Sequence, residues 1–281
     1  FICSKKQCDS AGFKIDEVID KLKSENTPYI DTGEDSTLFG DRYLFYGHDE
    51  KEGLLPYVLR KLFLKRVEIN KNLSEGKYKG DEKIAMEKRQ WTYKIILNSA
   101  YGAMGFPFFR LYKPECADAI TFFARQALKF ATLKFNKNHK VLYGDTDSIF
   151  VKSNGSTESE MKEKLVEFNE LLKTEFVQKY NPKVSNEFML MDLKFEYDLE
   201  YIYFGESKKR YYSIIRETGK KYIRGMNIIR KDAPEFLKKA LNVVTEMAIR
   251  DNLNLEHLTQ LRKKIETIDY KDILFASFPN N

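Results

Sequence analysis

The chain has 281 residues, 42% of them hydrophobic, and its 48 basic and 42 acidic side chains give a net charge of +6. It can therefore bury a large core and has room for two or three substructures. The mild positive charge is compatible with simple solubility or with a polyanionic partner. No apolar run reaches the roughly 18 residues of a membrane span, and we find no signal peptide.

The three cysteines, Cys3, Cys8 and Cys116, follow no metal-ligand spacing. Their odd number favours a reducing compartment, with metal binding by Cys3 and Cys8 as the alternative. The chain begins at Phe1 instead of methionine, which indicates a piece of a longer protein or a processed product.

The first half of the chain is predicted to change from loops to helices. Residues 1 to about 50 are rich in turn residues around short aromatic segments. Apolar residues then recur at helical spacing from Gly53 to residue 73, and a second helix is predicted over 83–105. The polar segment 74–82 joins them, so we predict an antiparallel helical hairpin.

The second half mixes helices and strands. We predict a helix over 114–136, a β-hairpin in KVLYGDTDSIFV, and a helix to about Tyr180 that starts at a capping box from Thr157 to Glu160. A three-stranded meander with turns at GES and ETG follows, and the chain is helical from Asp232 to near 265. The predicted class is α+β: a mainly antiparallel sheet backed by helices.

The hairpin segment YGDTDS carries two aspartates between apolar strands. If Asp145 and Thr146 form the turn, Asp147 opens the return strand and shares a face with Ile149 and Val151. Asp147 is then the better ligand for a hard cation such as Mg²⁺, and Asp145 is the weaker one, because aspartate in a turn also satisfies local N–H groups. The alternative is a plain aspartate-rich turn.

The second predicted helix carries a polar stripe. Lys94, Asn98 and Tyr101 stand at i, i+4 and i+7, where a cation, an amide and a phenol can meet a nucleotide. Folding the hairpin about residue 78 brings Arg66 within roughly a turn of Lys94, and two cations suit phosphate charge. The alternative is a solvated basic face.

The segment KKRY is predicted to open a strand. Alternation puts Lys208 and Arg210 on one face and Lys209 and Tyr211 on the other, which suits contact with a nucleic-acid backbone. The alternative is a charged edge strand that resists aggregation.

Together, these segments resemble the family B (α-like) DNA polymerases over about residues 50–240. KIILNSAYG matches the family's fingers motif Lys-x-x-x-Asn-Ser-x-Tyr-Gly, YGDTDS its palm motif and KKRY its primer-strand motif, in the family's order. The segment 53–66 is similar to its first fingers helix, and IRGMNIIRKDAPEF is similar to its passage from palm to thumb. The resemblance implies an antiparallel palm sheet, helical-hairpin fingers and a partial helical thumb.

The resemblance also implies roles for these residues. Asp147, with Asp145 secondary, would bind two Mg²⁺ ions that join the dNTP and the primer 3′-hydroxyl. Lys94 and Arg66 would hold the triphosphate, Asn98 would assist at the nucleotide and Tyr101 would pack on the nascent base pair. Contacts with primer–template DNA are implied for five residues: Gly102 at the template base, and Lys208, Lys209, Arg210 and Tyr211 at the primer.

Several features depart from the family pattern. Asn70 and Asn227 stand where the family carries a basic residue and a glutamate, respectively. Residues 1–53 contain no Asp-x-x-Ser-Leu-Tyr-Pro-Ser-like motif, and we find no 3′–5′ exonuclease signature. We therefore expect a missing N-terminal portion or a second polypeptide to supply the other palm aspartate, and no synthesis by the chain alone. Protein-primed relatives carry an insertion between the fingers and palm motifs. The 51 residues from Lys94 to Asp145 leave no room for such a domain, which favours a nucleic-acid-primed, phage-type enzyme.

The expected domains are a palm-proximal segment (1–52), fingers (53–105), palm (106–232) and a thumb, partial here (233–281). The expected location is the cytoplasm of a bacterial or phage-infected cell or another DNA-containing compartment. The alternative function is a non-catalytic polymerase-like scaffold that binds DNA, or a split-polymerase subunit. An unrelated phosphate-handling protein with chance motifs is the third alternative.

Overall fold

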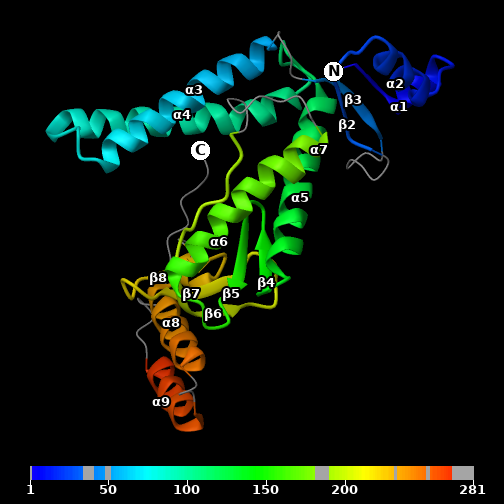
Figure 1. Ribbon diagram of the computed structural model, residues 1–281. Helices are drawn as coiled ribbons and strands as arrows, with labels where there is room; N and C mark the ends of the chain where they lie inside the picture. The colour runs from blue at the N-terminus through cyan, green and yellow to red at the C-terminus, as the bar shows by residue number, and fades with distance from the viewer. Residues whose placement is uncertain are drawn as a thin grey trace. The chain divides into compact units, whose positions relative to one another are not determined.

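The computed structural model describes residues 2–33, 41–47, 52–180, 190–230, 233–250 and 254–267. The chain forms two compact units, Phe1–Leu193 and Lys194–Asn281, which we describe separately. Long helices and small antiparallel sheets confirm the predicted α+β class (Figure 1). In the described ranges, no helix is long and apolar enough to cross a membrane.

The first unit begins with a small three-stranded sheet flanked by two helices. The strands are β1 (Cys3–Ser4), β2 (Tyr29–Asp31) and β3 (Tyr43–Tyr46), in the antiparallel order β1-β3-β2. The helices are α1 (Lys5–Ser10) and α2 (Ile15–Ser24). The segment was expected to be loop-rich, and both helices were missed. The buried core between these helices and the sheet consists of Cys8, Ile15, Ile19, Leu22 and Leu44.

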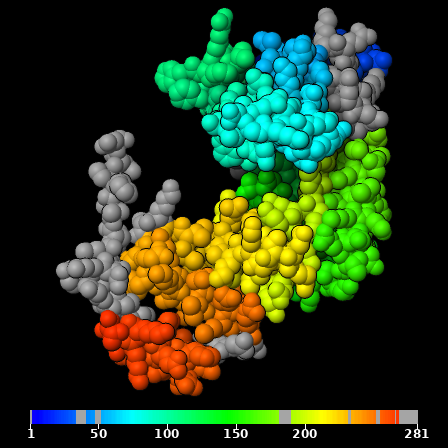
Figure 2. All heavy atoms as spheres, turned by 90° about the vertical axis from the view of Figure 1, so that its left-hand side faces the viewer, coloured from blue at the N-terminus to red at the C-terminus, as the bar shows by residue number. Residues whose placement is uncertain are grey.

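The predicted helical hairpin is confirmed as α3 (Leu54–Ser74) and α4 (Gly80–Met104). The two helices pack against each other, and Gly76 and Gly80, both in left-handed conformations, lie in or directly after the turn. Little of the hairpin is buried, since Ile69 and Met104 are its only buried residues. In Figure 2, the tip of this hairpin, in cyan, faces the viewer.

The predicted β-hairpin is confirmed as β4 (Lys140–Asp145) and β5 (Ser148–Lys152). One of its faces packs on α5 (Pro114–Phe135) and on α6 (Glu158–Leu171), which continues as a π-helix (Leu172–Val177) and α7 (Gln178–Tyr180). The predicted capping box begins α6: Thr157 N–H donates to Glu160 Oε2 at 2.7 Å, and Glu160 N–H donates to Thr157 Oγ1 at 3.3 Å. The core between sheet and helices is aromatic, with Phe130, Phe135, Phe168 and Phe176 in ring contact.

The second unit contains the predicted meander. Its strands β6 (Leu199–Phe204), β7 (Tyr211–Ile215) and β8 (Lys221–Arg224) form an antiparallel sheet in that order. A 3₁₀ turn (Asn227–Ile229) leads to helices α8 (Glu235–Ile249) and α9 (Leu255–Glu266). The division between the units after Leu193 falls inside the range expected for the palm, and the four-domain assignment stays a prediction.

Candidate functional site

The two aspartates lie at the end of the β4–β5 hairpin, but the turn is shifted by one residue from the expected one. Asp145 is the last residue of β4 and pairs with Ser148, so Thr146 and Asp147 form the turn. The prediction that Asp147 opens the return strand was wrong. Asp147 is exposed in the turn, and its N–H donates to the carbonyl of Asp145 at 2.6 Å. Strand alternation therefore does not fix its direction.

Asp145 is the aspartate that the sheet orients. Ile149 and Val151 of β5 pack on the helical core, so the alternate residue Ser148 faces the other side. Residues opposite each other in an antiparallel pair share a face, which places Asp145 with Ser148. Asp145 therefore lies on the face turned away from that core, half-buried, and the exposed Asp147 is beside it in the turn.

Thr146 joins the two aspartates in a strained conformation. Its φ of 57° lies in the left-handed region, which β-branched residues rarely adopt. Its hydroxyl donates to Asp145 Oδ1 at 3.0 Å, and the Ser148 hydroxyl donates to the Asp145 carbonyl at 3.1 Å. Both hydroxyls thus brace the carboxylate end of the hairpin. The sequence placed Thr146 in the predicted turn, but neither hydroxyl was expected to contribute to the site.

The stripe on α4 is solvent-exposed, as a binding face requires. Lys94, Asn98 and Tyr101 are all exposed on the same helix. The Lys94 ammonium lies 5.2 Å from the centre of the Trp91 ring, a cation–π contact that restrains an otherwise mobile side chain. Trp91 was missed in the sequence, although its i, i+3 spacing to Lys94 predicts such a contact.

Arg66 lies on the helix that packs against α4, as expected. The residue is half-buried, and its Nε atom is buried with no hydrogen-bond partner among the described residues. A buried guanidinium donor without a hydrogen-bond partner destabilises the fold, and a hydrogen bond to an anion would offset that cost. The close approach of Arg66 to Lys94 stays a prediction.

Gly102 follows the stripe in the last turns of α4. A Cβ at this position would meet no atom of the described residues within 4 Å, so no contact in those ranges requires glycine here. Alanine is favoured over glycine in a helix by about 1 kcal/mol. An external molecule that approaches the backbone, as expected of the template base, is one physical reason for glycine at this position.

The KKRY segment differs from its expected conformation. Strand β7 begins only at Tyr211, which is 4% exposed and packs against Phe204 and Tyr222. The preceding Lys208, Lys209 and Arg210 lie in the β6–β7 turn and are exposed. Their predicted strand alternation was wrong because Lys209 adopts a left-handed φ of 64°. The three cations cluster on one turn instead of dividing between two faces of a sheet.

Two contacts hold this cationic turn, which we define as residues 208–210. The Gly205 N–H donates to the carbonyl of Arg210 at 2.8 Å. The Lys209 carbonyl packs closely against Gly225, because a Cβ at position 225 would lie only 2.2 Å from the Lys209 oxygen. Gly225, the glycine of the segment IRGMN, is therefore a structural partner of the cationic turn, a contact not expected from the sequence.

Helix α8 is joined to the meander by a polar cluster that runs from the buried Tyr212 to the exposed Lys221. The Tyr212 hydroxyl and the Lys221 ammonium both donate to Asn242 Oδ1, at 3.3 and 3.1 Å, and Lys221 pairs with Glu246 at 3.0 Å. Burial raises the pKa of the Tyr212 phenol. Burial alone would lower the pKa of Lys221, but its bonds to Glu246 and Tyr212 raise it. The cluster fixes the helix on the strand that follows the cationic turn.

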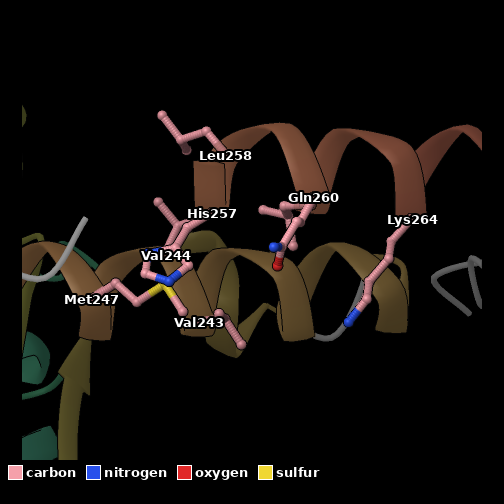
Figure 3. A pocket seen from close by; sticks show the side chains of 8 residues that line it. Val243, Val244, Met247, His257, Leu258, Gln260 and Lys264 are labelled. Carbon is pink, nitrogen blue, oxygen red and sulfur yellow. The ribbon is translucent and has the colours of Figure 1, made fainter. Parts of the chain in front are cut away.

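A pocket lies elsewhere in the second unit, between α8 and α9 (Figure 3). Most of its lining is apolar, and His257, Gln260 and Lys264 of α9 point toward α8. Its full lining is Val243, Val244, Met247, His257, Leu258, Gln260, Leu261 and Lys264. None of these residues belongs to the predicted site, so the pocket does not support a role in nucleotide binding.

The described residues fit a magnesium ion only in part. No group of three or more His, Cys, Asp or Glu residues could hold a metal within the described ranges. Mg²⁺ needs only one or two carboxylates when phosphate oxygens and water complete its octahedral shell. Asp145 and Asp147 offer such a pair, and a two-ion site requires a further carboxylate.

Comparison with known proteins decides the family. The model of DNA polymerase family B matches residues 14–278. The chain belongs to DNA polymerase family B. It is 31% identical over 214 residues to DNA polymerase 1 of Pyrococcus abyssi, and 30% identical over 217 residues to a DNA polymerase of Archaeoglobus fulgidus. These matches cover 76% of this chain but only 26% and 25% of those polymerases.

A solved structure supports the fold of this family B chain. The family B DNA polymerase of the hyperthermophilic archaeon Pyrobaculum calidifontis aligns with a TM-score of 0.52 and 23% identity, over 87% of this chain and 30% of that one. Similarity at this identity establishes the fold alone. The chain spans about a quarter of the curated relatives' length, so the activity of a whole polymerase is a proposal here.

Proposed function

We propose that this chain carries fingers, palm and thumb elements of a template-directed DNA polymerase that transfers a nucleotide from dNTP to a primer 3′-hydroxyl. The observation that carries this proposal is the end of the β4–β5 hairpin, where Asp145 and Asp147 lie two residues apart in a chain of family B. Two adjacent carboxylates repel each other in water, and a divalent cation removes that cost. Bound Mg²⁺ would activate the primer hydroxyl and stabilise the pyrophosphate.

Each candidate site residue has a defined task in this proposal. Asp147 and Asp145 hold the cation, and Thr146 and Ser148 brace the Asp145 end of the hairpin. Lys94 and Arg66 neutralise the triphosphate, and they stabilise the charge that develops on the leaving pyrophosphate. Asn98 and Tyr101 position the nucleotide and the nascent base pair, and Gly102 leaves space for the template base.

The primer strand is assigned to the cationic turn. Three exposed cations on one turn can neutralise adjacent phosphates, and the buried Tyr211 anchors the end of that turn in the sheet. Phosphate contacts of this kind position DNA without reading its sequence. The chain still needs the other palm aspartate from a preceding portion or a second polypeptide, so alone it should bind primer–template DNA but not extend it.

Direct measurement of DNA binding tests this proposal. Fluorescence anisotropy with labelled primer–template should show affinity that falls steeply with salt, with a log–log slope of about −0.9 per phosphate contact. Changing Lys208 and Lys209 to alanine should weaken binding and flatten the slope. The matched control changes Lys21 and Lys23 of α2, two exposed lysines that form surface ion pairs, and should have no effect. Salt-independent binding, or equal loss in both variants, would refute the assignment.

A nucleotide titration separates catalysis from the scaffold alternative. A catalytic chain, supplied with the second aspartate, should bind dNTP more tightly with Mg²⁺ than without it, and Asp147→Asn should remove that difference. A scaffold would bind DNA equally well, but its dNTP affinity would not depend on Mg²⁺, and Asp147→Asn would not change that affinity.

A further inference from the structure

Two cysteine sulfurs lie together in the first unit. The Sγ atoms of Cys3 and Cys8 are 3.1 Å apart, with the Cys8 thiol donating to Cys3, and both residues are free cysteines. Cys8 is 4% exposed within the core beside α2, whereas Cys3 is partly exposed at the edge of the sheet. Cys3 is therefore the more exposed of the two cysteines, and Cys8 lies in the core next to it.

Local helix chemistry explains why the sulfurs meet. Ser4 is the N-cap of α1, and it forms a capping box with Gln7: Gln7 N–H donates to Ser4 Oγ at 3.1 Å, and Ser4 N–H donates to Gln7 Oε1 at 3.0 Å. In this motif the residue before the cap packs on the fourth helical residue. Those two positions are Cys3 and Cys8. Apolar side chains ordinarily make this contact, and here thiols make it.

We propose that Cys3 and Cys8 form a dithiol that low-molecular-weight disulfides such as oxidised glutathione convert to an intrachain disulfide. The Cys3 thiolate attacks one sulfur of the reagent and releases one thiolate, which leaves a mixed disulfide on Cys3. The Cys8 thiolate then attacks the Cys3 sulfur and releases the second. The protein loses two electrons and two protons, and the reagent is reduced to two thiols.

The environment of Cys3 makes the reaction depend on pH. Burial and the hydrogen bond from Cys8 raise the pKa of Cys3 to about 12. Because only the thiolate attacks, the oxidation rate should rise about tenfold for each pH unit through the neutral and mildly alkaline range. The third cysteine, Cys116, is half-buried with no sulfur partner among the described residues, and it serves as an internal control.

Mass spectrometry of the full chain after incubation with oxidised glutathione tests the proposal. We expect a loss of about two mass units, one remaining free thiol out of three, and a peptide in which Cys3 and Cys8 are linked. Cys116→Ser should leave this result unchanged. Cys8→Ser should stop at a stable mixed disulfide on Cys3. Because that variant removes a core residue, the linked peptide of the unaltered chain is the decisive result.

Other products would overturn the proposal. A mixed disulfide that persists on Cys3 in the unaltered chain would show that Cys8 cannot reach it. A disulfide that includes Cys116, or a dimer between two chains, would show that another pair is more reactive. The proposal does not depend on the polymerase function, since neither the reagent nor the readout involves DNA.

Discussion

The carbonyl oxygen of Lys209 lies so close to the backbone of Gly225 that a Cβ at position 225 would be 2.2 Å from that oxygen. Gly225 also has a left-handed φ of 61°. Gly225→Ala should therefore cost more than the roughly 1–2 kcal/mol of the backbone conformation alone, and it should move the cationic turn. We expect lower stability in urea unfolding and weaker binding of primer–template DNA.

Gly219 provides the matched control for this change. It has the same kind of backbone, with φ of 64°, but a Cβ there would meet no described atom within 4 Å. Gly219→Ala should cost only about 1–2 kcal/mol and leave DNA affinity unchanged. Equal effects of the two substitutions would show that the contact between Lys209 and Gly225 contributes nothing.

Gly102→Ala should separate folding from function. The substitution creates no contact with the residues that the structure describes and improves helix propensity, so it should stabilise the chain by about 0.5–1 kcal/mol. If the template base approaches this backbone, the same change should weaken nucleotide incorporation. Thermal unfolding checks the first effect. Primer extension by the chain together with a polypeptide that supplies the other palm aspartate checks the second. Unchanged incorporation would remove Gly102 from the template site.

Lys94→Ala should mainly impair use of the nucleotide. We expect the KM for dNTP to rise and kcat to fall, because the lysine binds the triphosphate and stabilises the leaving group. Trp91→Ala should have a smaller effect in the same direction, since a cation–π contact at an exposed site contributes about 0.5–1 kcal/mol. Steady-state kinetics with varied dNTP would show this order. A larger loss from Trp91→Ala would contradict it.

Acid should weaken the first unit through Asp31. Arg42 donates to both carboxylate oxygens of Asp31, at 2.9 and 2.6 Å. Burial alone would raise the pKa of Asp31, but bonds from Arg42 and the Gly33 N–H lower it. A lowered pKa gives stability that is present above the unfolded value of about 3.9 and is lost as pH falls through the folded value.

Asp31→Asn should therefore destabilise the chain by about 1–3 kcal/mol at neutral pH, and it should reduce the acid-dependent loss of stability. Urea unfolding over a pH series checks this. Asp20→Asn, at a surface position paired with Lys23 at 3.8 Å, is the control and should follow the unaltered chain. A parallel pH dependence in Asp31→Asn would refute the role of the ion pair.

Periodic segments of this chain were predictable, and the exact turns were not. The helices around Lys94 and after Thr157 follow from apolar spacing and a capping box that depend on local residues alone. The Asp147 and Lys209 predictions failed for a different reason. Each depended on where a turn ends, and a left-handed residue, Thr146 or Lys209, shifted the first residue of the following strand.

Two further features of the structure were not predicted from the sequence, for physical reasons. The helix containing Ile15 and Leu22 has a clear amphipathic pattern, which the turn residues around it obscured in the sequence. The support that Gly225 gives to Lys209 could not be predicted, because it joins residues from two loops whose approach depends on strand register.

The most direct test of the central claim is single-turnover primer extension by this chain complemented with a polypeptide that supplies the other palm aspartate. We predict that Asp147→Asn lowers the rate by a factor on the order of 10³ while the Kd for primer–template DNA stays nearly unchanged. Asp20→Asn should behave like the unaltered chain. Near-normal turnover by Asp147→Asn would show that this carboxylate does not hold the catalytic metal.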